Sequence, residues 1–296
     1  METELIKKLN RIRAFINVDK IIKGEKNSPA DIRKYYVIND PAYRKFHSDH
    51  GFMHFRVSEK DGEKGNVYYQ PDTVSKYVKS GDNVVELGPG QGANIFYLSG
   101  SRQDANWTGI DLLPPKRPKK QPNIRLIRGD YSDMRAIESE SVNVVFGIET
   151  VVHSSDKDKV FKEVARILKP KGIFILYDYA TQKAFSEYPK DFQTVIELIS
   201  KCGACALIES DDEWEEHFSK NGFERVSKQD LGKKTLPDLH RLGLTARRVF
   251  DHDRRIKLVF GLLPKTLTNN ALIAYLAEDC VKEDIFYYNE WIYRKK

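Results

Sequence analysis

The chain has 296 residues, of which 40% are hydrophobic and 11% aromatic, enough for one large domain with a substantial core. Its net charge of +6 arises from 49 basic and 43 acidic side chains, a balance too mild and too mixed to indicate a nucleic-acid partner. No apolar stretch approaches the roughly 18 residues of a bilayer-crossing helix, and residues 1–27 are charged throughout, unlike a secretory signal. We therefore expect a cytoplasmic protein that has no transmembrane segment and does not bind nucleic acid.

The N-terminal segment predicts a basic amphipathic helix. Leu5, Leu9, Ile12 and Ile16 fall on one stripe at helical spacing, while lysines and arginines lie largely elsewhere. Such a helix can lie on an anionic membrane surface, which would make peripheral membrane contact. A lid helix packed across a ligand cleft explains the same pattern, and we favour packing.

The most informative motif runs from residue 84 to 94. A short apolar strand carries Glu86 and is followed by Gly88, Gly90 and Gly92. Glycine tolerates the dihedral angles of a tight turn and lets a ligand lie against the backbone, so this segment predicts a strand, a turn and a helix start around a nucleotide-like ligand. The spacing also fits the loose dinucleotide-binding fingerprint, so the motif alone does not choose between ligands.

Two further strands end beside polar residues. Residues 107–111 predict a strand that ends at Asp111, about twenty residues beyond the glycine turn, where a carboxylate can hold both ribose hydroxyls. Residues 124–128 predict the next strand, which is followed by Asp130 and Tyr131.

The alternation of strands and helices continues downstream. Residues 142–148 predict a fourth strand that runs into Glu149, and residues 156–168 predict a helix with an acidic start and a Lys-Pro-Lys-Gly stop. A fifth strand, 173–177, ends at Asp178. This order predicts a parallel α/β sheet with its site at the carboxyl ends of the strands.

The C-terminal part completes the sheet and adds an insertion. Helices are expected at 182–200 and 213–220, a sixth strand at 222–226 and a seventh at 285–293. The intervening segment, 232–284, is longer than an ordinary loop. We predict a Rossmann-like, seven-stranded, mostly parallel sheet with helices on both faces.

Two short segments allow a functional and a structural interpretation. The basic, proline-rich residues 114–122 predict an extended loop, which either attracts an anionic acceptor or, as we favour, is a solvated connector. Cys202 and Cys205 have the spacing of a redox or half-zinc motif, but a structural zinc needs four ligands. We favour packing near a helix end and expect no metal.

These motifs, from Gly81 to Asp178, resemble in order and spacing those of the class I S-adenosylmethionine-dependent methyltransferases. Residues 148–157, with the following helix and Leu-Lys-Pro-Lys-Gly, resemble the small-molecule branch containing sterol, tocopherol and phosphoethanolamine methyltransferases. Residues 35–43 and 52–55 are similar to the N-terminal lid of sterol methyltransferases and cyclopropane fatty-acid synthases.

The resemblance implies that the chain binds S-adenosyl-L-methionine and releases S-adenosyl-L-homocysteine. Asp111 would hold the ribose, Asp130 and Tyr131 would frame the adenine, and the Ile148 carbonyl would accept from the cofactor's amino group. Alternatively, Glu86 caps the turn and Tyr131 is ordinary packing. The implied cofactor-binding residues are Tyr35, Tyr36, Glu86, Gly88, Gly90, Gly92, Asp111, Leu112, Asp130, Tyr131 and Ile148.

Methyl transfer from a sulfonium is an in-line displacement, so the enzyme mainly aligns the reactants and excludes water. A base is needed only when the acceptor carries a proton, and His153 is the candidate because its pKa lies near neutrality. The resemblance pairs it with a lid tyrosine, best Tyr36 and otherwise Tyr35. Glu149 and Asp178 either orient the acceptor, stabilise a developing cation or hydrogen-bond to neighbouring loops.

The resemblance also implies a domain organisation. It consists of an N-terminal helical lid (1–75), a cofactor-binding core (76–231), a helical cap over the acceptor (232–284) and the last core strand (285–296). The cap mixes apolar and basic residues, which suits an apolar or amphipathic acceptor. The same residues would serve a dimer interface, so both a monomer and a homodimer remain open.

Three functions compete at this point. A small-molecule methyltransferase fits the segment after the fourth strand. A nucleic-acid or protein methyltransferase is the alternative, although this segment lacks the Asn/Asp-Pro-Pro-aromatic sequence of enzymes that methylate base amino groups. A non-catalytic protein that holds the cofactor or a membrane surface is the third.

Overall fold

The computed structural model describes residues 2–24, 30, 32–34, 36–39, 51–60, 63–115, 121–262 and 265–296. In these ranges seven strands form one sheet with the order β3-β2-β1-β4-β5-β7-β6. Neighbouring strands from β3 to β5 pair in parallel, whereas β7 runs antiparallel to both β5 and β6. The predicted fold class is therefore confirmed. The strands are β1 (Asn83–Leu87), β2 (Asn106–Asp111), β3 (Ile124–Arg128), β4 (Val142–Ile148), β5 (Leu168–Thr181), β6 (Phe223–Asp230) and β7 (Phe286–Lys295).

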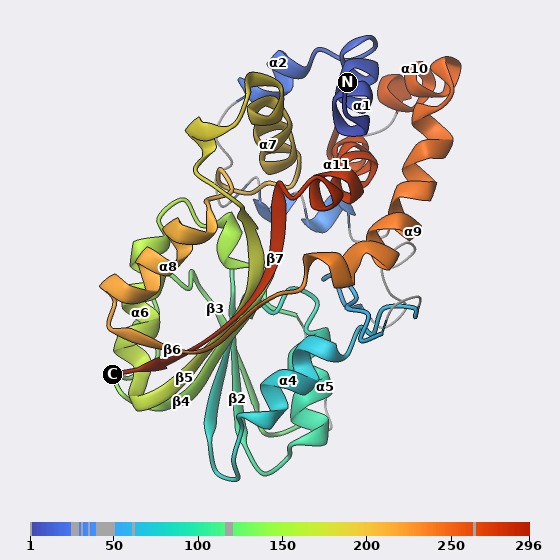
Figure 1. The fold of residues 1–296 in the computed structure, drawn as a ribbon. Coiled ribbons are helices and arrows are strands. Elements are labelled where there is room, and N and C mark those ends of the chain that lie inside the picture. The colour runs from blue at the N-terminus through green and yellow to red at the C-terminus, as the bar shows by residue number, and fades with distance from the viewer. Residues whose placement is uncertain are drawn as a thin grey trace.

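Helices cover both faces of the sheet (Figure 1). On one side lie α4 (Tyr69–Lys76) and α5 (Ala93–Ser101), and on the other α6 (Lys157–Ile167) and α8 (Asp211–Lys220). The central strands β1 and β4 are almost entirely buried, since apolar side chains point into the cores on both faces. This packing on both faces fixes the positions of the carboxyl ends of the parallel strands.

The fifth strand is longer than predicted, which shifts the helix that follows it. The expected helix stop at residues 169–172 is part of β5, because Leu168 already pairs with Val142 before a break in the register. At its other end β5 stays paired with β7 as far as Thr181. The helix expected from residue 182 therefore begins only at Lys190, as α7 (Lys190–Cys202).

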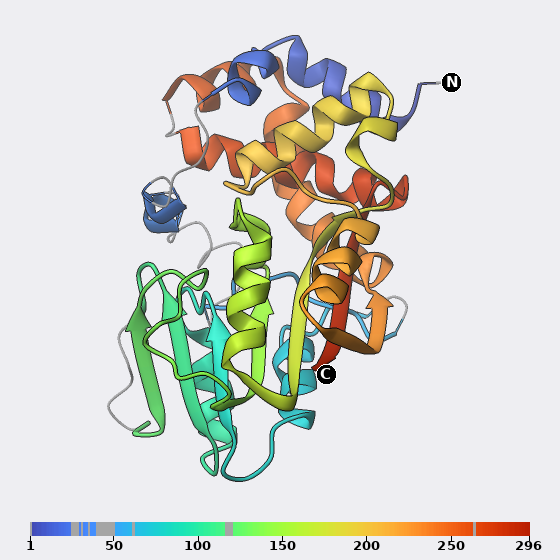
Figure 2. The same cartoon turned by 90° about the vertical axis from the view of Figure 1, so that its left-hand side faces the viewer.

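The insertion between β6 and β7 folds as helices α9 (Gly232–Phe250), α10 (Asp253–Leu262) and α11 (Lys265–Lys282). Together with α7, these helices form a cap above the carboxyl ends of the parallel strands (Figures 1 and 2). The cap has an apolar core of its own, made mainly of α7, α9 and α11 side chains. None of the helices in the described ranges is both long and apolar enough to cross a bilayer.

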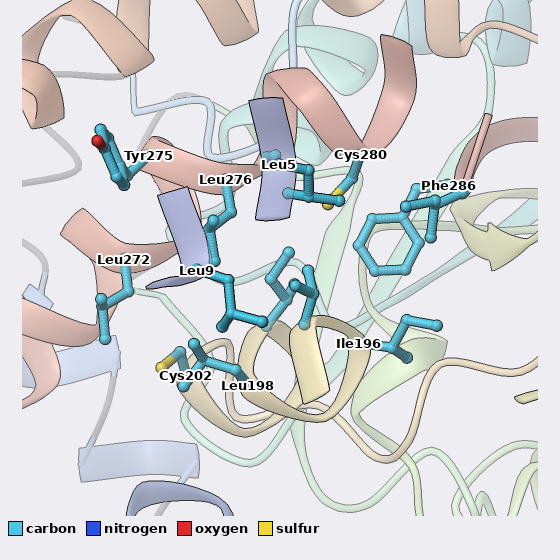
Figure 3. Packing of buried hydrophobic residues seen from close by; sticks show 14 of the residues in the cluster. Leu5, Leu9, Ile196, Leu198, Cys202, Leu272, Tyr275, Leu276, Cys280 and Phe286 are labelled. Carbon is cyan, nitrogen blue, oxygen red and sulfur yellow. The ribbon is translucent and has the colours of Figure 1, made fainter. Parts of the chain in front are cut away.

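The N-terminal helices α1 (Glu4–Arg13) and α2 (Val18–Ile22) pack on this cap. Leu5 and Leu9 are fully buried against α7 and α11 (Figure 3). The Lys8 ammonium donates to the Tyr275 carbonyl and forms a buried ion pair with Asp279. The favoured packing is thus observed, but on the cap's own core, and the buried stripe does not offer an apolar face to a membrane.

Candidate functional site

The turn after β1 is built around glycines with positive φ. Gly88, Gly90 and Gly92 have φ of 62°, 54° and 84°, a region that L side chains rarely adopt. A Cβ at Gly88 would lie 2.1 Å from the Thr150 Oγ1, so the turn and the segment after β4 approach each other closely. Gly88 and Gly90 line a large cavity, whereas Gly92 lies outside its wall and starts α5.

Glu86 lies behind the turn, not against the cavity. Its side chain is 2% exposed and lies beside Asn94 and the Ile95 backbone at the start of α5, and its Oε2 is buried without a hydrogen-bond partner among the described residues. The other face of Asn94 contacts His54, with 3.1 Å between Asn94 Oδ1 and His54 Nε2. Burial raises the pKa of Glu86 to about 8. This placement corresponds to the alternative in which Glu86 supports the turn.

The carboxylate at the end of β2 faces the glycine turn. Asp111 Oδ2 accepts from the Gly90 N–H at 2.9 Å, and Oδ1 accepts from the Leu113 N–H at 2.7 Å. Asp111, Leu112, Asp130 and Tyr131 all line the cavity. The Tyr131 hydroxyl also donates to the Thr150 carbonyl at 2.8 Å, which ties the loop after β3 to the loop after β4.

His153 and Tyr36 meet at the edge of the cavity. His153 lies in a short 3₁₀ turn (Val151–His153), and its Nε2 is 2.7 Å from the Tyr36 hydroxyl. Its Nδ1 is 3.1 Å from the Ala204 carbonyl, which requires a proton on Nδ1. Burial lowers the pKa of His153, so the neutral imidazole has Nε2 free to accept from Tyr36. Tyr35, the other lid tyrosine proposed for this role, lies outside the described residues.

Glu149 is held in a strained conformation directly after β4. Its φ is 50°, which is unusual for a non-glycine residue and common at functional sites. Its Oε1 accepts from the Phe55 N–H at 2.7 Å, and its Oε2 accepts from the Tyr179 hydroxyl. Burial raises the pKa of Glu149 to about 8. Glu149 lines the cavity, so it is placed to contact a ligand bound there.

Asp178 does not reach the cavity wall. It is fully buried and accepts from the Val152 N–H at 2.9 Å and the Tyr179 N–H at 3.1 Å. Burial raises its pKa to about 7. Of the three alternatives for Asp178, these contacts match hydrogen bonding to a neighbouring loop, here the turn that carries His153, and they correct the expectation that Asp178 acts on the acceptor.

The cavity has a volume of about 1050 Å³ and two unlike halves. One half is lined by the glycine turn, Asp111, Asp130 and Ile148, at the carboxyl ends of the strands. The other extends between α9 and α11 and is mostly apolar, with Thr235, Thr245 and Asn270 as its polar residues from these helices. The apolar half is lined by Leu239, Leu242, Ala246, Val249, Leu267, Ala271, Ile273 and Ala274, among others.

Some residues of this cavity were not predicted as site residues from the sequence. Met53, His54 and Phe55 belong to a strap across the glycine turn, and Met53 approaches Gly90. Their resemblance to a family lid was the available signal. The cap residues gave only a helical apolar pattern, which does not distinguish a core face from a cavity wall.

The structure describes both cysteines of the possible metal or redox motif but only part of the basic, proline-rich loop. Cys202 is buried in the cap core at the end of α7, and Cys205 lines the cavity with its thiol pKa raised by burial. Both are free thiols, as packing near a helix end predicts. Residues 116–120 of the basic loop lie outside the described residues.

A family model described as a methyltransferase domain matches residues 85–176, which include the glycine turn, Asp111 and Glu149. The chain contains a class I S-adenosylmethionine-dependent methyltransferase domain. The resemblance seen in the motifs is thereby confirmed.

Known proteins are similar to this methyltransferase domain over larger parts of the chain. A sterol 24-C-methyltransferase of Pneumocystis carinii is 23% identical over 169 residues, which are 54% of this chain and 44% of that protein. The chain spans about half the length of the curated relatives it matches.

Solved structures share the fold. The cyclopropane synthase MmaA2 of Mycobacterium tuberculosis aligns with a TM-score of 0.71, 15% identity and coverage of 91% of this chain and 99% of that one. A geranyl diphosphate C-methyltransferase of Streptomyces coelicolor, solved with S-adenosyl-L-homocysteine, has a TM-score of 0.62, 14% identity and coverage of 90% and 98%. At these identities the likeness concerns the fold, and the reaction must be argued from the site.

Proposed function

We propose that the protein transfers a methyl group from S-adenosyl-L-methionine to a small apolar or amphipathic acceptor. The observation that carries this proposal is the two-part cavity, in which a glycine-lined half meets an apolar half beside Tyr36, His153 and Glu149. A donor and an acceptor held in the two halves would meet at this boundary.

The residues of the first half fit the cofactor. Gly90 leaves backbone open to a ligand, since among the described residues an added Cβ would contact just the Met53 sulfur, at 3.5 Å. Asp111 beside it supplies carboxylate oxygens for two ribose hydroxyls, and Ile148 supplies a backbone carbonyl for an ammonium group. When bound, the cofactor supplies an electrophilic methyl group.

The protein's own contribution is alignment, exclusion of water and movement of one proton. The apolar walls from α9 and α11 keep water from the acceptor. For an acceptor with an O–H or N–H, His153 Nε2 accepts the proton, either directly or through the Tyr36 hydroxyl that is hydrogen-bonded to it. Glu149 lies on the same wall and orients the acceptor or stabilises positive charge that develops on it.

The cavity favours a small acceptor over a macromolecule. Its apolar half lies between cap helices, and the whole cavity, at about 1050 Å³, has the size of a small-molecule site. A nucleic acid or a protein side chain would need an open, polar or basic groove at the same place. The Tyr36–His153 pair supports catalysis over cofactor storage, because storage needs no proton acceptor at this boundary.

Calorimetry with S-adenosyl-L-homocysteine and NADH tests the cofactor assignment. We expect binding of the former only. Tight binding of NADH without S-adenosyl-L-homocysteine would overturn the proposal.

Label transfer tests the acceptor class. The protein is incubated with methyl-labelled cofactor and fractionated cell extract, and we expect label in a small, lipid-extractable molecule. Label found only in RNA or protein would replace the proposed acceptor class with the macromolecular one.

A further inference from the structure

One cation in the wall of the cavity has no counter-ion among the described residues. Arg33 lines the cavity and is half-buried, and its Nε is shielded from solvent without a hydrogen-bond partner among the described residues. A buried donor without a partner is costly, so such groups call for a ligand or another explanation. The described carboxylates provide no ion pair for Arg33.

The other basic side chains among the described residues of the cavity wall have partners. Lys159 pairs with Asp156 at 3.1 Å. His54 and His153 have pKa values lowered by burial and are hydrogen-bonded. Arg33 is therefore the wall cation, within the described ranges, whose charge is left uncompensated.

The position of Arg33 links it to the acceptor half. Arg33 lies three residues before Tyr36, residues 32–34 and 36–39 are helical, and both Arg33 and Tyr36 line the cavity. Tyr36 reaches His153, after β4, whereas the carboxylates of the cofactor half stand at the ends of β2 and β3. Arg33 thus places positive charge near the reacting boundary and beside the apolar wall.

We propose that Arg33 binds the anionic end of an amphiphilic acceptor, a carboxylate or phosphate on an aliphatic body that lies between α9 and α11. The planar guanidinium suits both anions, since it donates two parallel hydrogen bonds to either. This inference rests on the proposed function and specifies the chemistry of its acceptor. S-adenosyl-L-methionine also carries a carboxylate. The test therefore separates binding of the acceptor's anion by Arg33 from binding of the cofactor's carboxylate by Arg33.

The test compares three ligands with the same twelve-carbon chain and different head groups: dodecanoate, dodecanol and dodecyltrimethylammonium. Their binding is measured by calorimetry below micellar concentrations, in the presence of saturating S-adenosyl-L-homocysteine. We expect the wild-type protein to bind dodecanoate about tenfold or more tightly than dodecanol, as befits a charge-assisted hydrogen bond, and the cation most weakly. Dodecyl phosphate should share the preference.

Three variants isolate the role of the side chain. Arg33→Gln should abolish the preference for the anion, and Arg33→Lys should retain part of it. Lys34→Gln removes the same charge from the neighbouring, exposed position and should leave the preference intact. Thermal unfolding of each variant shows that the cap is folded.

Several results would overturn the inference. One is equal binding of dodecanoate and dodecanol by the wild-type protein. A second is unchanged selectivity between dodecanoate and dodecanol in Arg33→Gln. A third is weaker binding of S-adenosyl-L-homocysteine by Arg33→Gln while this selectivity is retained; that result would assign Arg33 to the cofactor carboxylate. Absence of S-adenosyl-L-homocysteine binding to the wild-type protein would instead refute the proposed function itself.

Discussion

The two halves of the cavity are built in different ways. The cofactor half comes from backbone within a few residues of the strand ends, with Gly88 and Gly90 at positive φ and Asp111 fixed by two backbone N–H groups. The acceptor half comes from side chains of α9 and α11, helices separated along the chain by α10.

This difference in construction indicates which half of the cavity tolerates substitutions. A backbone turn with a close approach to Thr150 tolerates little alteration, whereas an apolar wall accepts other side chains of suitable size. We therefore infer that acceptor choice can vary without loss of cofactor binding. The boundary between the halves, where Tyr36, His153 and Glu149 lie, must serve both.

The largest expected effect is at this boundary. His153→Ala should lower turnover by roughly 10²- to 10⁴-fold for an acceptor that loses a proton, because it removes the proton acceptor. Tyr36→Phe should also lower turnover if the proton passes through its hydroxyl. Steady-state kinetics at saturating cofactor measure both, and exposed His252→Ala is the control.

The same pair makes a prediction about pH. Since burial lowers the pKa of His153 below its usual 6.5, the wild-type turnover should stay on its plateau down to pH values below 6.5 and fall only when the imidazole becomes protonated. A pH profile with its acid limb above 6.5, or full turnover in His153→Ala, would contradict the assignment.

The next effect concerns the cofactor half. Gly88→Ala introduces a Cβ 2.1 Å from Thr150 Oγ1 and requires positive φ, so S-adenosyl-L-homocysteine should bind roughly 100-fold more weakly. Gly81→Ala is the matched control, because Gly81 has φ of 81° but no atom within 4 Å of the added Cβ. Both variants should lose about 1–2 kcal/mol of stability from the left-handed backbone, and Gly88→Ala should lose more because of the clash with Thr150, but only Gly88→Ala should lose affinity in calorimetry. Equal affinities for the two variants would show that close approach to Thr150 is irrelevant.

The same contrast explains how far the sequence alone predicts the molecule. Strands with short apolar runs and the glycine turn are local features, so β3 and β4 were predicted with their observed bounds. Seven of the residues expected to bind the cofactor line the cavity on the strand side: Gly88, Gly90, Asp111, Leu112, Asp130, Tyr131 and Ile148. Asp178 and Glu86 were assigned to the site from predicted positions near strand ends, but neither lines the cavity, because the direction of a side chain depends on tertiary packing. Pairing with β7 extends β5 to Thr181 through contacts about a hundred residues apart, which no local pattern reveals.

A smaller effect is expected when the acceptor half is filled. Ala271→Phe adds a ring to the apolar wall and should reduce methylation of the identified acceptor about tenfold, while S-adenosyl-L-homocysteine affinity stays within about twofold. Leu258→Phe, on the exposed face of α10, is the control for a ring added to the cap. A parallel loss of cofactor affinity in Ala271→Phe would mean that the two halves are not independent.

The last prediction concerns the stability of the protein, and it tests the buried support of the turn. The pKa of Glu86 is raised from 4.5 to about 8 by burial, so between these pH values the folded protein binds more protons at this side chain than the unfolded chain does. Stability from this residue is therefore greatest at low pH and falls as pH rises through that window, by at most about 1.4 kcal/mol per pH unit. Glu86→Gln keeps the shape and cannot ionise, so its stability relative to wild type should increase steadily from pH 5 to pH 8. Urea unfolding of the ligand-free proteins at several pH values measures this difference, with exposed Glu138→Gln as the control. A difference between Glu86→Gln and wild type that does not change with pH would show that Glu86 is ionised in the folded protein, and the turn would then rest on a charge, not on a neutral carboxyl group.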